Sequence, residues 1–167
     1  RITDSHRAAD PLADLVTRIS HYHPGDTDLA WTRTTPWRAL LASTMDQSCG
    51  WVTRAEVVAE DHLPSADLLA AWLSQRLEVP VERRVSSGPG ITETVLVTED
   101  GPITISRKDG RVATMQRPNR PLQTVALSRR HLSEYLAEEL RHLDADEMYA
   151  ATAKFLAERL ARAEVSA

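Results

Sequence analysis

The sequence is poor in cysteine, lysine and aromatic residues, and these scarcities exclude several classes of protein. Cys49 is the single cysteine, Lys108 and Lys154 are the lysines, and only 5% of residues are aromatic. One cysteine cannot form an intrachain disulfide, so a reducing, cytoplasmic location is expected rather than a secreted disulfide scaffold. No apolar run approaches the roughly 20 residues that span a bilayer, which excludes a membrane-embedded chain.

The balance of charge and the absence of catalytic signatures narrow the function further. The 24 acidic residues outnumber the 20 basic ones. Nucleic-acid affinity comes mainly from basic side chains that neutralise phosphates, so no nucleic-acid partner is expected. The chain also lacks the GxxxxGK[ST] phosphate loop, the GxGxxG and GxSxG turns and the HExxH metal motif. We therefore expect a protein that is not an enzyme and has neither a cofactor nor a metal ion.

The first half of the chain has the signals of an α/β arrangement. Asp10 as N-cap and Pro11 begin a helix that ends before Pro24. Thr35 is expected to cap a second helix, with Pro36 at its first position, that runs to about Gln47. A strand over 51–59, a helix from Ser65 and a strand over 79–85 follow. This order of strand, helix and strand predicts a parallel crossover.

The middle of the chain changes to short β-rich runs. The dipeptides Asp100-Gly101 and Asp109-Gly110 separate the runs 91–98, 103–107 and 112–116, and Asp-Gly between apolar runs indicates a hairpin. An antiparallel meander is therefore predicted. Its solvated face is expected to carry four hydroxyl side chains: Thr92, Thr94, Thr104 and Ser106.

Two helices are predicted at the C-terminal end. Ser128 is expected to cap the first, and Asp144 with Glu147 forms a capping-box pattern that begins the second. The fold class is therefore α+β, in a single domain that is expected to be the C-terminal part of a longer chain. Its three segments are an α/β half over 1–86, a β-meander over 87–127 and a helical pair over 128–165.

One segment is unusually rich in tryptophan and arginine. Residues 28–42 read DLAWTRTTPWRALLA and contain Trp31, Arg33, Trp37 and Arg38. Tryptophan and arginine are enriched at protein-binding hot spots. Three interpretations stay open at this point. The tryptophans belong to the core and the arginines pair with nearby acids such as Asp26 or Asp28; the segment binds a protein; or the helix start near Thr35, flanked by Arg33 and Arg38, binds an anion.

A fourth interpretation concerns metal binding. His21, His23, Asp26 and Asp28 lie close together in the sequence and have side chains that ligate metals, so they could form the site of a metal-dependent hydrolase. This interpretation requires all four side chains to converge in space. The histidine spacing is a weak signal, because an imidazole at a helix end also interacts favourably with the helix dipole.

The tryptophan-rich segment resembles the hallmark motif of the OpcA family, the glucose-6-phosphate dehydrogenase assembly proteins. LLAAWLSQRL over 68–77 and TVALSRRHLSEYLAEELRHLDADEMY over 124–149 are also similar to that family. The resemblance implies a non-enzymatic protein that binds glucose-6-phosphate dehydrogenase, promotes its active oligomer or its activity, and so supports NADPH production in the oxidative pentose phosphate pathway. The partner-binding motif would then consist of Asp28, Trp31, Arg33, Pro36, Trp37 and Arg38.

One feature departs from the family. Photosynthetic members are redox-controlled through cysteines, and with Cys49 alone this chain has no internal disulfide switch. The alternative function is a domain that senses an anion or a sugar phosphate at the helix start near Thr35.

Overall fold

The computed structural model describes residues 1–46, 50–141 and 144–165. The N-terminal segment begins with β1 (Ile2–Thr3) and the short 3-10 helix η1 (Ser5–Arg7), followed by α1 (Pro11–Ser20). The strand β2 (Thr27–Asp28) pairs in parallel with β1. As predicted, the Asp10 side chain caps α1 by accepting a hydrogen bond from the Ala13 amide.

Two helices follow β2 almost without interruption. The short helix α2 (Leu29–Thr32), which the sequence did not predict, leads into α3 (Thr35–Met45). Thr34, not Thr35, is the N-cap residue of α3, so the predicted cap was wrong by one position. Because Thr34 has helical backbone angles, its hydroxyl donates back to the Trp31 carbonyl instead of capping the new helix. The predicted helix end at Gln47 lies outside the described residues.

The main sheet has six strands in the order β4-β3-β5-β6-β7-β8. The parallel crossover is confirmed, since β3 (Val52–Ala59) passes through α4 (Pro64–Leu77) to the parallel strand β4 (Val81–Val85). The meander is confirmed as well. Its antiparallel strands are β5 (Ile91–Thr98), β6 (Gly101–Ser106), β7 (Ala113–Gln116) and β8 (Gln123–Val125).

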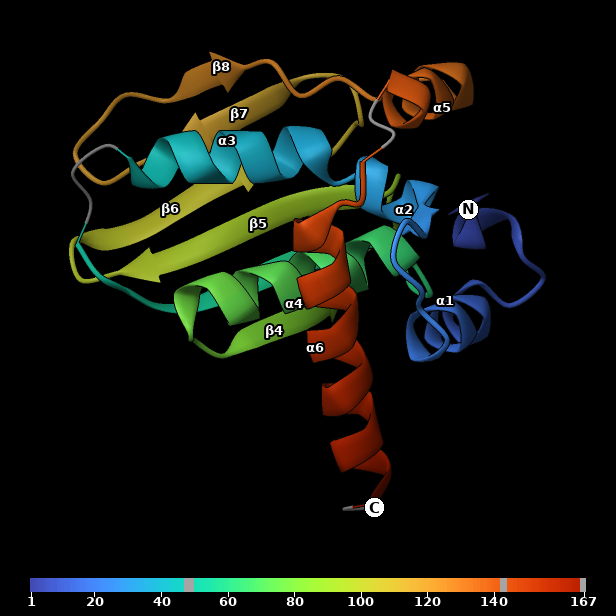
Figure 1. Ribbon diagram of the computed structural model, residues 1–167. Coiled ribbons are helices and arrows are strands. Elements are labelled where there is room, and N and C mark those ends of the chain that lie inside the picture. The colour runs from blue at the N-terminus through green and yellow to red at the C-terminus, as the bar shows by residue number, and fades with distance from the viewer. Residues whose placement is uncertain (47–49, 142–143, 166–167) are drawn as a thin grey trace.

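The helices α3 and α4 lie on one face of this sheet (Figure 1). The buried residues of β3, Ala55, Val57 and Ala59, alternate along the strand as expected for a sheet with one covered face. Small side chains along α4 let the helix pack closely, and most of its residues are buried. One connected cluster of buried apolar side chains joins these helices, the sheet, α1 and α6.

The orientation of β5 differs from the prediction that all four hydroxyl side chains of the meander lie on its solvated face. Thr104 and Ser106 lie on the more open face as expected, but Thr94 is buried over the core. Thr92 is also buried, at a register shift between β3 and β5, where its hydroxyl lies 2.9 Å from that of Ser86 and donates to the Val58 carbonyl. Apolar residues occur on both sides of β5, so alternation alone did not decide its orientation. The register pairs Thr94 with Ile105 and Leu96 with Ile103, which places these two β5 residues over the core.

The two C-terminal helices are α5 (Leu132–Arg141) and α6 (Glu147–Val165), and α6 extends past the rest of the molecule at its C-terminal end (Figure 1). Neither predicted cap is correct. α5 begins after His131, whose amide donates to Glu134, and Ser128 lies before it. Asp146, not Asp144, accepts from the Tyr149 amide at the start of α6. The mixed α+β class is confirmed. In the described part of the chain, no helix is long and apolar enough to cross a membrane.

Candidate functional site

The tryptophan- and arginine-rich segment runs from the end of β2 through α2 into α3. Its two indole rings are among the largest fully buried side chains of the protein. The folded chain therefore places Trp31 and Trp37 in the core, where neither ring is accessible to another protein. This burial favours a structural role for the two tryptophans.

Trp31 joins α2 to the beginning of α6. Its indole Nε1 donates a 2.7 Å hydrogen bond to Oδ2 of Asp146, whose other oxygen accepts from the Tyr149 amide. The Tyr149 ring packs against the indole with centroids 5.8 Å apart. On the other side, the Arg38 guanidinium lies 3.7 Å from the indole centroid, a cation–π contact. Trp31 is thus surrounded by groups from α3 and α6.

A second link joins α2 to α5. Thr32 donates a 2.6 Å hydrogen bond to Oε1 of Glu139, which is 107 residues further along the chain. The guanidinium of Arg33 lies 5.3 Å from the ring centroid of Tyr135, the buried residue of α5. The motif therefore contacts both C-terminal helices, and α6 also packs against α1 and α4.

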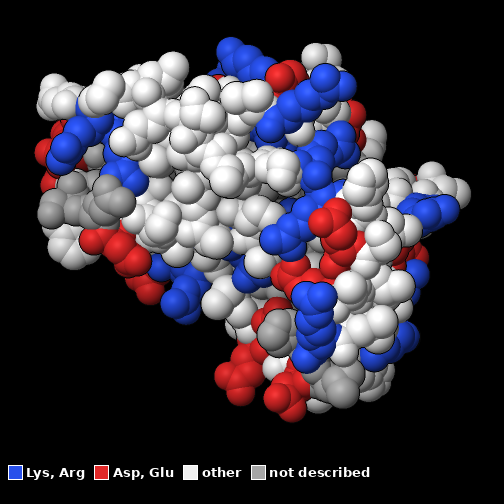
Figure 2. Space-filling model, turned by 90° about the horizontal axis from the view of Figure 1, so that it is seen from above, with Lys and Arg blue, Asp and Glu red and all other residues white. Residues whose placement is uncertain are grey.

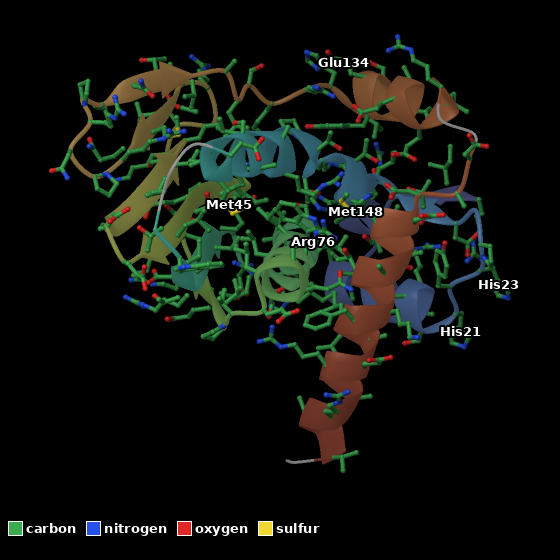
Figure 3. All side chains as sticks on the ribbon, turned by 60° about the vertical axis from the view of Figure 1, so that its left-hand side comes forward. His21, His23, Met45, Arg76, Glu134 and Met148 are labelled. Carbon is green, nitrogen blue, oxygen red and sulfur yellow. The ribbon has the colours of Figure 1, made fainter. Side chains whose placement is uncertain are left out.

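The two arginines of the motif have different partners. Arg33 forms a bidentate ion pair with Asp4, with N–O distances of 2.7 and 3.0 Å. Arg38 has no carboxylate within ion-pair distance among the described residues and donates to the Thr34 and Thr35 hydroxyls. Its third nitrogen contacts the Met148 sulfur at 3.2 Å, and Figure 3 shows Met148 at the first turn of α6. Burial lowers the pKa of Arg38 to about 10, so the group stays charged at neutral pH.

Asp28 and Pro36 have structural positions. Asp28 is completely buried, and its carboxylate accepts from the Thr3 hydroxyl, the Ser5 amide and hydroxyl, and the Ala30 amide. It therefore ties the N-terminal segment to the start of α2. Pro36 lies in the first turn of α3, where its missing amide hydrogen costs nothing.

The surroundings of Thr35 do not favour an anion. Thr35 and Arg38 line a hollow of about 560 Å³ together with Arg1 and five carboxylates. These carboxylates belong to Asp26, Glu138, Glu139, Asp144 and Asp146. Since acids outnumber bases there, the field opposes the anion site predicted at this helix start.

The proposed metal cluster does not form. Among the described residues, no group of three or more His, Cys, Asp or Glu side chains is placed to hold a metal ion. His21 and His23 each contact a backbone carbonyl through Nδ1 and lie at the outer edge of the molecule (Figure 3). Asp26 pairs with Arg1, whereas Asp28 is enclosed by its own donors. Cys49 lies outside the described residues.

Sequence reasoning missed the residues that face the motif from far along the chain. The local sequence pattern assigned no functional role to Asp146, Glu139 or Arg107. Their contacts with Trp31, Thr32 and Trp37 join residues that are 70 or more positions apart. No local spacing signals such pairs. The sequence offered one signal for Arg107, its position directly after a strand with alternating polarity.

Taken together, these contacts define a mixed α+β domain in which a tryptophan- and arginine-rich segment attaches two C-terminal helices to the core. Residues 24–153, more than three-quarters of the chain, match the family described as the C-terminal domain of the glucose-6-phosphate dehydrogenase subunit. The chain belongs to this family, which confirms the resemblance to OpcA proteins. No curated protein matched the chain.

Proposed function

We propose that this chain is a non-enzymatic, cytoplasmic partner of glucose-6-phosphate dehydrogenase that binds the enzyme and promotes its active oligomer or its activity. Its effect is to raise NADPH formation in the oxidative pentose phosphate pathway. Membership of the dehydrogenase-associated family supports this partner. The observation that carries the proposal is an exposed row of leucines on α5.

The leucine row consists of Leu132, Leu136 and Leu140. These side chains are 39%, 40% and 57% exposed, and their spacing of four residues places them along one side of α5. Single exposed leucines are ordinary on protein surfaces, but a contiguous apolar strip is typical of an interaction site. A helix face of this kind fits an apolar groove on a partner protein.

Residues of the motif contact α5, the helix that carries the leucine row. Thr32 and Arg33 contact α5, and Trp31 fixes Asp146 at the start of α6. A helix that is already fixed loses less conformational freedom when a partner binds, so its contacts yield more net affinity. We therefore assign Trp31, Arg33, Trp37 and Arg38 a positioning role in dehydrogenase binding, rather than direct contact by the whole motif.

The proposal is tested by mixing the chain with glucose-6-phosphate dehydrogenase from the same source. Light scattering after gel filtration measures the size of the complex, and NADPH formation measures the activity. We expect the wild-type chain to co-elute with the enzyme and to change its oligomeric state or its rate. The double variant Leu136→Glu/Leu140→Glu should bind about 100-fold more weakly, because two charges would have to be buried at the contact.

Leu122→Glu is the matched control. Leu122 is at least as exposed as the α5 leucines but lies before β8, so this variant should bind normally. Failure of the wild-type chain to bind would overturn the proposed function. Equal weakening by Leu122→Glu and by the α5 variant would overturn the assignment of the surface.

A further inference from the structure

A small arginine-lined pocket lies on the other side of the motif from the acidic hollow. Its volume is about 220 Å³, and its walls come from η1, α3, the start of β5, the end of β6 and the segment before α5. Four arginines line it: Arg33, Arg107, Arg129 and Arg130. No Asp or Glu is among its described lining residues. Figure 2 shows several Lys and Arg side chains, with some Asp and Glu among them, in the upper right part of the face seen from above.

Arg107 is the most unusual member of this pocket. Its side chain is only 6% exposed, yet no described carboxylate lies within ion-pair distance. Two of its nitrogens donate to the carbonyls of Leu127 and Ile91, at 2.6 and 3.3 Å. The buried Nε–H has no hydrogen-bond partner among the described residues. A buried cation without a counterion is costly, so this arrangement favours an anion.

Among the neighbours of Arg107, Arg129 adds positive charge, and Asp109 acts on Arg107 only from beyond ion-pair distance. Burial and the positive charge of Arg129 both lower the pKa of Arg107, and the two arginines line the same pocket. The guanidinium of Arg129 also lies close to Gly90, where an added Cβ would be 3.8 Å from it. Arg33 and Arg130 already pair with Asp4 and Glu138. Arg107 and Arg129 are therefore the two arginines in the pocket that have no carboxylate partner among the described residues.

His6 contributes a neutral donor to the same pocket. Its Nε2 accepts a hydrogen bond from the Ser65 amide, which leaves the proton on Nδ1. Burial, with the charge of Arg33, lowers the pKa of His6 to about 4, so the ring is uncharged at neutral pH. Tyr135 also lines the pocket, and its hydroxyl accepts a hydrogen bond from the Arg130 amide. Guanidinium groups without a carboxylate partner, with neutral hydrogen-bond donors beside them, are suited to bind a phosphoryl dianion.

We propose that the pocket formed by Arg107, Arg129, Arg33 and His6 binds the phosphate group of a small ligand, either inorganic phosphate or a phosphomonoester. The volume admits a phosphoryl group with a short attached chain but not a nucleotide. The site differs from the anion site expected at Thr35, because the acidic hollow lies on that side. The proposal goes beyond dehydrogenase binding and does not depend on it.

Isothermal titration calorimetry of the isolated chain at constant ionic strength tests the proposal. Inorganic phosphate and glycerol 3-phosphate are titrated separately, with acetate and glycerol as controls. We expect saturable binding of the phosphate ligands at one site and none of the controls. Tighter binding of glycerol 3-phosphate would identify a phosphomonoester as the ligand, and equal binding would identify phosphate itself. Both results support the site.

The variant Arg129→Gln locates the binding. Its exposed side chain makes no hydrogen bond within the described part of the chain, so the variant should fold, and we expect at least about tenfold weaker binding. Arg76→Gln removes an exposed arginine on α4, outside the pocket, and should bind normally. Phosphate should also shift the NMR signal of the Arg107 Nε–H. No saturable binding, or equal loss in both variants without that shift, would overturn the proposal.

Discussion

The indole nitrogen of Trp31 donates a 2.7 Å hydrogen bond to the carboxylate of Asp146, and the two residues are 115 positions apart. The same carboxylate caps α6 through the Tyr149 amide. One acidic side chain thus caps the start of a helix and also joins that helix to the core. Changes at either residue are expected to affect the attachment of the C-terminal helices as well as local stability.

Replacing Trp31 by phenylalanine should destabilise the protein. The change removes the hydrogen bond to Asp146 and leaves space beside Tyr149, so we expect the free energy of unfolding to fall by about 2–3 kcal/mol. Urea denaturation followed by circular dichroism measures this. Trp51→Phe is the control, because Trp51 is 82% exposed, and its effect should stay within about 0.5 kcal/mol. Equal effects of the two changes would contradict the role given to Trp31.

The contact between Thr32 and Glu139 should control how firmly α5 is held. Thr32→Val keeps the shape of the side chain but removes the 2.6 Å hydrogen bond, at a cost of about 1 kcal/mol. Amide hydrogen exchange in α5 should then become about fivefold faster. Thr17→Val removes a hydroxyl that bonds within α1 and should leave exchange in α5 unchanged. Unchanged exchange in the Thr32 variant would show that the contact does not hold the helix.

The buried carboxylate of Asp28 should be far more important for stability than the less buried carboxylate of Asp26. In Asp28→Asn an amide group would face donors from Thr3, Ser5 and Ala30, so we expect a loss of about 2–4 kcal/mol in unfolding free energy. Asp26→Asn removes a surface ion pair with Arg1 and should cost less than about 1 kcal/mol. Thermal unfolding of both variants gives the comparison. Similar losses would mean that Asp28 does not tie the N-terminal segment to α2.

His6 should make the protein less stable in mild acid. Its pKa is about 4 in the folded state and 6.5 in the unfolded state, so between these values the unfolded chain binds more protons. Stability is therefore lost as the pH falls from 7 toward 4. By linkage, and with allowance for partial exposure, the loss from pH 7 to pH 5 is about 1–2 kcal/mol.

His6→Gln isolates this contribution. Unfolding free energies of the wild type and the variant, measured by urea denaturation at several pH values, should converge as the pH falls, because the variant lacks the titrating group. Curves that stay parallel between pH 7 and pH 5 would show that His6 is not held neutral in the fold.

The sequence by itself determined the order of the longer helices and strands and the family. Asp10 with Pro11 began a helix, Asp-Gly dipeptides marked hairpins, and the pattern over 28–42 identified the family that the comparison then confirmed. Caps were less predictable. Ser128 and Asp144 have side chains suited to an N-cap, but neither caps its helix. Which residue caps a helix depends on where the backbone enters it, and the local sequence does not fix that position.

Only the tertiary structure decided what the motif does. Local spacing reports which residues share a helix face or a strand face, but it says nothing about what packs on that face from 70 or 115 positions away. The face of β5 that is buried followed from its register with β6, and the basic character of the pocket followed from arginines on three separate segments. The local sequence is compatible with several strand registers and several contacts between distant segments. Burial of apolar side chains favours one of them, and this brings these groups together.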